Sequence, residues 1–418
     1  MRPLSRRGFL TGLSVTAGGA ALAACSTDVR SSTRTADTTA DIDPAAVETR
    51  LEGAIVPFDG VHQAGIATPA QAHLNLVAFR LGEEVDRAGL ARLLRLWTED
   101  ARRLCTGEAP LGSLEPEMTT VPANLTVTCG FGPRVFEVAG ARDRRPDWLA
   151  PLPEFSRDQL DPAWGQSDLV LQFCCDDPTM LSHAVRHMVR SGTDYAGVQW
   201  MQQGFLRADG GAPTGSTPRN LFGQLDGTVT ARSDREWDEQ AWIGEGPDWL
   251  VDGTAMVVRR ISMNLDSWEM LDRTSREEST GRTLDTGAPL TGGGEFTEAD
   301  YEARDGFGLP VIDPDSHMAR ARPAADHPEQ RLARRSYNYD LPPVPGSGQL
   351  SNSGLVFICF QQDPDKQFTP IQARLDEADR LNEWITHIGS AVYWIPPGTS
   401  ADGRGRDAWW GAGLLESL

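Results

Sequence analysis

Lysine is almost missing from this 418-residue sequence, since Lys366 is the single lysine among 39 basic residues and the other 38 are arginine. An arginine is therefore a weak candidate for catalysis on its own. Positive charge is also scarce overall, because 59 acidic residues leave a net charge of −20. A chain this acidic would repel phosphate backbones, which argues against nucleic acid as a partner.

Paired cysteines and long apolar runs are missing as well. Apart from Cys25, the chain has five cysteines without CxxC spacing or a paired framework, at 105, 129, 174, 175 and 359. Most of them lie inside apolar runs, so we expect buried thiols rather than disulfides or metal ligands. The apolar stretch near the N-terminus is short and rich in Gly and Ala, which does not predict a membrane span.

The first 48 residues have the features of an export signal and a tether. Ser5-Arg6-Arg7-Gly8-Phe9-Leu10 is typical of the twin-arginine (Tat) route, which carries folded proteins and suits a cofactor acquired in the cytoplasm. Leu22-Ala23-Ala24-Cys25 resembles a lipobox, with an ordinary signal-peptidase site as the alternative. We expect residues 1–25 to be the Tat signal and lipobox and 26–48 to be a flexible linker. The mature protein would then be extracytoplasmic, either secreted or a cell-surface lipoprotein tethered to the membrane through Cys25.

The remaining sequence contains one pattern twice. In the first copy, an apolar segment ending in Asp-Pro (169–178) is followed by a helical stretch (180–190) and a further strand (197–201). In the second copy, the corresponding segments are 355–364, 371–388 and 391–395. First strands are expected at 73–79 and 256–263, second strands at 124–129 and 335–339, and a helix at 85–105. Strand, helix, strand, strand, helix, strand is the ferredoxin-like order. We predict an α+β fold with ferredoxin-like domains at 49–230 and 231–418; one large α+β domain is the alternative.

Residues 273–333 depart from this plan, because they are polar, charged and rich in Gly and Pro. Long loops of this kind are usually disordered or functional, and His317 lies in this one. The segment Gly223-Gln-Leu-Asp226-Gly227-Thr228 lies upstream, and Arg334 follows at the start of a strand. Each of these signals is weak alone, since a GxxDG sequence also marks ordinary turns.

Together, the segments resemble the dye-decolourising peroxidases, in the branch that includes exported deferrochelatase/peroxidases. The resemblance covers about residue 50 to the C-terminus, with the motifs in the family's order, and it implies two ferredoxin-like domains and one haem b per chain. It implies His317 as the axial iron ligand and Asp226 and Arg334 as the catalytic residues on the opposite side. The other positions that it places beside the haem are Gly227, Thr228, Val229, Leu355 and Phe357.

The implied function is a haem peroxidase that reduces hydrogen peroxide and oxidises bulky or phenolic donors, such as dyes, in one-electron steps. The alternative from the same resemblance is a deferrochelatase-like protein that handles haem or iron in envelope iron uptake, with uptake proteins as partners. A third reading is a binding module of this architecture without haem. The sequence leaves homo-oligomerisation open.

Several choices stay open at this level. Arg335 is the alternative to Arg334, and only one of two neighbouring strand residues can face a haem. Asp379 and Glu383 would share one face of the second helix, and we favour Glu383 over Asp379 as the partner of His317.

Other histidines and aromatic residues compete for these roles. His183 and His187 have helical i,i+4 spacing but are expected on an exposed face, and His327 is the second choice for the iron ligand. Surface radicals that relay electrons from bulky donors are a hypothesis for the rings of Trp409, Trp410, Tyr337 and Tyr339.

Overall fold

The computed structural model of the protein describes residues 51–213, 215–401 and 407–418. The predicted Tat signal, the lipobox with Cys25 and the 26–48 linker lie outside the described residues. Thr49–Leu418 form one compact unit. In the part of the chain that the structure describes, no helix is long and apolar enough to cross a membrane.

The N-terminal half follows the predicted order of elements. Its strands and main helices are β1 (His73–Leu81), α1 (Arg87–Cys105), β2 (Thr126–Phe131), β3 (Leu169–Cys175), α3 (Pro178–Ser191) and β4 (Ala196–Phe205). Helix α2 (Pro133–Val138) lies in the connection between β2 and β3. The strands pair in the antiparallel order β2-β3-β1-β4. Helices α1 and α3 begin at the side-chain caps Asp86 and Asp177, which accept from Gly89 N and Met180 N.

The C-terminal half repeats this order with an enlarged first connection. Its strands and second helix are β5 (Thr254–Met263), β6 (Ala333–Arg334), β7 (Tyr337–Leu341), β8 (Asn352–Gln361), α8 (Phe368–Ala378) and β9 (Ile385–Ile395). The connection after β5 holds α5 (Leu265–Trp268), α6 (Arg273–Thr280) and α7 (His317–Ala321) in place of one long helix. Between β4 and β5 lies α4 (Asp234–Gln240), and α9 (Ala412–Glu416) ends the chain. The architecture is therefore α+β, with two ferredoxin-like halves.

The two halves close into one antiparallel barrel. The sheet order is β5-β9-β2-β3-β1-β4-β7-β8-β6, and an additional β5–β8 pairing closes the ring. The halves meet at two seams, each with one register pair: Phe131 of β2 opposite Trp394 of β9, and Phe205 of β4 opposite Asn338 of β7. The predicted boundary at 230/231 falls in the connection between β4 and β5.

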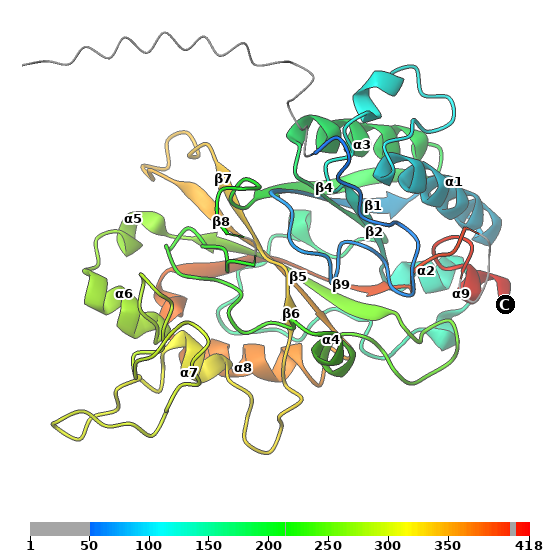
Figure 1. Cartoon of the computed structure of the whole chain (residues 1–418). Helices are drawn as coiled ribbons and strands as arrows, with labels where there is room; N and C mark the ends of the chain where they lie inside the picture. Colours follow the sequence, from blue (N-terminus) through cyan, green and yellow to red (C-terminus); the bar gives the residue numbers. More distant parts are fainter. Residues whose placement is uncertain (1–50, 214, 402–406) are drawn as a thin grey trace, which may run out of the picture. The chain divides into compact units, whose positions relative to one another are not determined.

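Apolar residues fill both faces of this sheet. One cluster takes side chains from strands of both halves, including Leu76, Val170, Met256 and Ile358. A second cluster lies under α1 and α3, where Trp97 is fully buried. Figure 1 shows α1 and α3 together beside the N-terminal half and α7 and α8 together beside the C-terminal half. The five cysteines at 105, 129, 174, 175 and 359 are buried free thiols, which confirms that prediction.

The predicted helix at 371–388 is wrong over its second half. Helix α8 ends at Ala378, and Asp379 has extended backbone angles (φ −65°, ψ 126°). The Asp379 carboxylate accepts from Leu381 N at 2.9 Å and begins a short 3-10 helix, η5 (Arg380–Glu383), before β9. The side chain therefore stops α8, and Asp379 and Glu383 do not share a helix face.

Candidate active site

His317 begins helix α7 and is held by a carboxylate from the segment after α8. Its Nδ1 lies 2.6 Å from Asp379 Oδ2. The Asp379 side chain is 1% exposed, whereas the His317 side chain is 34% exposed. Among the described residues, His317 Nε2 has no hydrogen-bond partner, so it is available to a ligand. The preference for Glu383 over Asp379 was wrong.

Arginine contacts fix the chain on both sides of His317. Arg320 donates to Asp315 Oδ1 from Nε at 3.0 Å and from Nη2 at 2.7 Å. Arg380 of η5 donates to Asp313 Oδ2, at 2.5 Å, and its backbone N donates to Asp315 O, at 2.9 Å. The loop that carries His317 is thus attached directly to the segment that carries Asp379.

The imidazole of His317 is electrostatically stabilised in its charged form. Burial opposes the charge, but the carboxylate of Asp379 outweighs burial through its charge and its hydrogen bond, so the pKa of His317 is raised. The charge of Arg334 lowers this pKa and that of Asp226 raises it. Both residues are therefore close enough to His317 to act on its charge.

Asp226 and Arg334, the two predicted catalytic residues, form an ion pair. Arg334 Nη1 lies 3.3 Å from Asp226 Oδ1, and the side chains are 24% and 15% exposed. Asp226 N donates to Pro218 O at 2.8 Å, and Arg334 N donates to Thr230 Oγ1 at 2.9 Å. The first bond closes the loop around Asp226, and the second joins the end of this loop to β6.

The sheet register distinguishes Arg334 from Arg335. Arg334 is paired with Cys359 of β8, so its side chain is on the same sheet face as Cys359, Phe357 and Leu355. Arg335 points the other way, where it is buried and donates to Thr68 O and Gln71 Oε1 of the N-terminal half. Arg334 is the arginine that lies beside Asp226.

The residues after Asp226 leave an open surface beside the ion pair. Gly227 has φ +119°, which other residues rarely adopt, and a Cβ there would meet only Thr217, at 3.8 Å. Thr228 Oγ1 donates to Glu295 Oε1 at 3.0 Å, which ties the loop to the long connection after α6. Val229 is 62% exposed.

Leu355 and Phe357 supply an apolar wall on the same face of β8. Leu355 is 7% exposed and belongs to a cluster with Phe222 and Trp268, against which Phe357 packs. Phe357 also contacts Phe368 of α8, with ring centroids 6.2 Å apart. The structure thus places the predicted site residues on the GxxDG loop, which precedes β5, and on β6, β8 and α7 of the C-terminal half.

Sequence reasoning missed two polar residues of the site. Asn220 Nδ2 donates to Asp226 Oδ2 at 3.4 Å, and Asn220 Oδ1 accepts from Phe222 N and Gln224 N at 3.1 and 3.2 Å. Glu295 accepts from Thr228 and also from Thr217. Asn220 could have been found from the sequence, because it lies in the same loop as Asp226, six residues before it. Glu295 could not, because it is 67 residues from Thr228 in the sequence.

Other candidates from the sequence lie outside this site. His183 and His187 are buried, not exposed, and His187 Nε2 lies 3.0 Å from Asp100 Oδ2. No group of three or more His, Cys, Asp or Glu that could hold a metal occurs within the described residues. His327 is an exposed loop residue beside Glu329.

The four rings proposed as surface relays are all buried, so that expectation was wrong. Trp409 and Trp410 are 6% and 1% exposed, and Tyr337 and Tyr339 are 0% and 1% exposed.

This donor set fits an iron porphyrin. A neutral imidazole whose Nδ1 proton goes to a carboxylate presents its Nε2 lone pair to iron, and this arrangement is usual for histidine ligands. His317 Nε2 is without a partner in the described chain, and an acid–arginine pair and apolar side chains lie close by. The fold and the site together define a haem peroxidase with two ferredoxin-like halves.

Comparison with known proteins agrees. Residues 63–206 match the N-terminal domain of Dyp-type peroxidases and residues 217–400 match their C-terminal domain. The chain is 37% identical to the dye-decolorizing peroxidase of Thermobifida fusca, over 96% of each protein. It is 34% identical to the deferrochelatase of Escherichia coli K12, over 82% of this chain and 84% of that one.

A solved structure is similar over most of the fold. The DyP-type peroxidase from Cellulomonas bogoriensis superposes with a TM-score of 0.83 and 50% sequence identity, covering 87% of this chain and 99% of that one. The chain belongs to the Dyp-type peroxidase family, whose members are haem enzymes.

Proposed function

We propose that each chain binds one haem b through His317 Nε2 and that Asp226 and Arg334 carry out the reaction with hydrogen peroxide. The observation that supports this most is the Asp226–Arg334 ion pair, at 3.3 Å, beside a histidine whose other nitrogen is fixed by Asp379. When bound, the haem supplies the iron that takes two oxidising equivalents from the peroxide. Organic donors would then supply two electrons, one at a time, and be oxidised in the process.

Asp226 is proposed to move the proton. Splitting the O–O bond requires a proton to pass from the inner to the outer peroxide oxygen. The Asp226 carboxylate accepts the first proton and returns it, while Asn220 and Arg334 hold its two oxygens in place. The planar guanidinium of Arg334 stabilises negative charge that develops on the leaving oxygen.

The test is the absorption spectrum of the purified protein before and after one equivalent of hydrogen peroxide. We expect a Soret band that shifts rapidly and returns when a reducing dye is added. Asp226→Asn and Arg334→Leu should each slow the shift by about 100-fold or more, the low end for a positioned acid–base group. Arg331→Leu, at an exposed position on the same connection, is the control. Rates within a few-fold of wild type for both site variants would rule out the proposed roles.

The second candidate is a deferrochelatase-like role in haem or iron handling, favoured by the 34% identity to a protein of that name. A carrier needs the axial ligand and a pocket but not the Asp226–Arg334 pair. A Soret band that bleaches slowly with peroxide, with iron released from the porphyrin, would favour this candidate. Uptake proteins would then be its partners.

We also propose that the chain is exported in its folded, haem-loaded state through the Tat route and tethered through Cys25. Arg6→Lys with Arg7→Lys should leave the protein in the cytoplasm, and Cys25→Ser should release it from the membrane fraction. An unchanged distribution in both variants would overturn this proposal.

Sedimentation of the mature protein would decide whether it forms homo-oligomers.

A further inference from the structure

A buried ion pair joins the N-terminal half of the protein to the sheet of the C-terminal half. Arg259 of β5 donates from Nη2 to Asp158 Oδ1, and the two side chains are 1% and 8% exposed. Arg259 Nη1 also donates to Ser390 Oγ of β9 at 3.3 Å, and its Cζ lies 5.5 Å from the ring centroid of Phe155. The N-terminal half thus supplies a carboxylate that balances a charge inside the C-terminal half.

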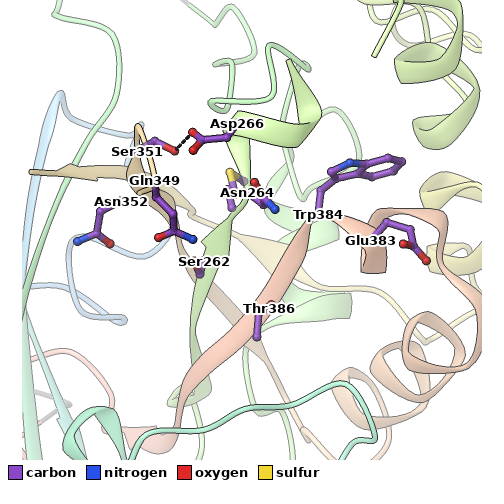
Figure 2. A pocket seen from close by; sticks show the side chains of 10 residues that line it. Ser262, Asn264, Asp266, Gln349, Ser351, Asn352, Glu383, Trp384 and Thr386 are labelled. Carbon is purple, nitrogen blue, oxygen red and sulfur yellow. Dashed lines mark hydrogen bonds between the residues drawn. The ribbon is translucent and has the colours of Figure 1, made fainter. Parts of the chain in front are cut away.

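The sheet register places this ion pair on the same face as the apolar wall of the candidate site. Arg259 is opposite Phe357 of β8, one of the two wall residues. Side chains alternate along a strand, so Ser262, three residues after Arg259, points the other way. Figure 2 shows that Ser262 and Thr386 of β9 line a polar cavity at the ends of these strands. The cavity and the ion pair are therefore separate features, and the ion pair is the one beside the wall.

His387 of β9 relates the ion pair to the surroundings of His317. Its Nδ1 lies 3.7 Å from Asp158 Oδ1. Burial and then the charge of Arg259 lower the pKa of His387 to about 3, and the charge of His317 also lowers it. His387 therefore lies within electrostatic reach of both Arg259 and His317, the proposed ligand of the iron.

The ion pair is incompletely satisfied, which is unusual for buried charged groups. Arg259 Nε and Asp158 Oδ2 are buried and have no hydrogen-bond partner among the described residues. The attraction between two buried charges offsets the cost of removing them from water only when hydrogen bonding is complete, and an apolar pair is often at least as stable. Stability therefore does not explain why a charged pair occupies this position.

The segment 155–161, which carries Asp158, is fixed to α8 and β9. Asp376 of α8 accepts from two backbone N atoms of this segment, both at 2.8 Å. Two further backbone bonds, of 2.9 and 3.0 Å, join the segment to β9. Because Asp379 follows α8 directly, these contacts also fix Asp158 relative to the carboxylate that binds His317.

We propose that Asp158 neutralises the charge of Arg259 beside the apolar wall and thereby keeps the reduction potential of the iron low; this rests on the proposed haem binding through His317. A positive charge near the iron favours the ferrous state, which carries one electron more than the ferric state. The ferric state is the one that reacts with hydrogen peroxide in the proposed function. Asp158 acts on the iron through Arg259 and is a positioning residue, not a catalytic one.

The test is the ferric/ferrous midpoint potential of the haem-loaded protein, measured by spectroelectrochemistry without peroxide. Asp158→Asn leaves the charge of Arg259 unbalanced. We expect the ferrous-to-ferric ratio at a fixed potential to rise about 10-fold, which is a midpoint shift of about +59 mV for one electron. Glu154→Gln, which removes an exposed carboxylate four residues before Asp158, is the control and should leave the midpoint unchanged.

A double variant separates the electrostatic role from a structural one. Asp158→Asn with Arg259→Met removes both charges, so the ferrous-to-ferric ratio should return to within about two-fold of wild type. The single and the double variant both lose the ion pair between segment 155–161 and β5. A purely structural role therefore predicts the same midpoint in both variants, and that result would contradict the inference.

Arg259→Met gives the opposite sign and serves if Asp158→Asn does not fold. The groups that then face Asp158 are His387 of β9 and Asp376 of α8. Burial raises the pKa of Asp158 and Arg259 opposes this rise, so without Arg259 the carboxylate is charged only above a raised pKa. We expect a midpoint below that of wild type at high pH and a difference that disappears as pH falls through this pKa. The same midpoint as wild type at every pH would rule the inference out.

Failure of the proposed function gives a different result. A wild-type chain without a Soret band would overturn haem binding and this inference together. A wild-type Soret band with the same midpoint in Asp158→Asn would overturn this inference alone.

Discussion

Asp379 is the more deeply buried partner of the His317 pair, with 1% of its side chain exposed against 34% for the histidine. One of its oxygens binds His317 Nδ1 and the other accepts from Leu381 N. The carboxylate is therefore held by the backbone before any cofactor arrives, and it fixes both the orientation of the imidazole and which nitrogen keeps the proton.

Removing this carboxylate should weaken haem binding. We expect Asp379→Ala to lower haem affinity by about 10- to 100-fold, the usual cost of losing the hydrogen-bond partner of a metal ligand. The transfer of haem from the enzyme to an acceptor globin measures this change. Glu383→Gln is the control, because Glu383 does not contact His317. Equal haem loss in the two variants would contradict the assignment of Asp379.

The neighbouring arginines should respond differently to the same substitution. Arg334→Leu removes half of an open ion pair, so we expect slower reaction with peroxide and a nearly unchanged midpoint of thermal unfolding. Arg335→Leu leaves the buried acceptor Gln71 Oε1 unpaired, at about 1–3 kcal/mol, and also removes the bond to the part-buried Thr68 O. Thermal unfolding and stopped-flow kinetics of both variants would check this, and a stable Arg335→Leu with slow peroxide reaction would reverse the roles.

At the level of elements, β9 carries a histidine that the fold keeps neutral. His387 is 6% exposed; burial and then the positive charge of Arg259 lower its pKa to about 3. In the unfolded chain the pKa is about 6.5. Between about pH 6.5 and pH 3 the unfolded state therefore binds a proton that the folded state does not, and stability falls as pH drops through this window.

Replacing His387 should remove this part of the acid sensitivity. Lowering the pH from 7 to 5 should reduce the free energy of unfolding by about 2 kcal/mol through His387 alone. Each pH unit below 6.5 contributes about 1.4 kcal/mol to this loss. His387→Gln should show a correspondingly smaller loss. Urea unfolding of both proteins at the two pH values measures the difference, and an identical loss in the variant would show that His387 does not titrate in this way.

The order of elements was predictable because local patterns encode it. The apolar segments at 169–175 and 355–360, each followed by Asp-Pro and a helix, gave β3 and α3 and then β8 and α8. The end of α8 comes from a local contact that the helical pattern hid, because the Asp379 carboxylate accepts from Leu381 N and begins η5. The contact of the same carboxylate with His317, 62 residues away, was not predictable from a local pattern.

The candidate site divides in the same way. The GxxDG aspartate, His317 and Arg334 stand in recognisable segments, so the family resemblance was enough to select them. The choice between Arg334 and Arg335 required the register with Cys359, and Glu295 depends on a contact across a long connection. The contacts of Trp384 with Trp268 and of Trp268 with Phe222 join rings from three separate segments, which no local pattern reveals.

At the scale of the whole molecule, the closed barrel makes the halves depend on each other. Strands β2 and β4 would be open edges in an isolated N-terminal half, and the cluster inside the barrel takes side chains from both halves. The seam between β2 and β9 has a single register pair and is filled by aromatic rings. Phe131 lies edge-on to Trp394, with centroids 5.5 Å apart, and both are fully buried.

We therefore expect one cooperative unfolding transition for the haem-free chain, and Phe131→Ala should destabilise both halves together. Truncating a buried phenylalanine costs about 3–5 kcal/mol. Hydrogen exchange of β1 in the first half and β5 in the second should then increase in parallel, because neither half keeps a complete core without the other. Exchange that rises only in the N-terminal half would show that the two halves unfold independently despite the shared barrel. The predicted boundary at 230/231 would then separate two independently unfolding domains.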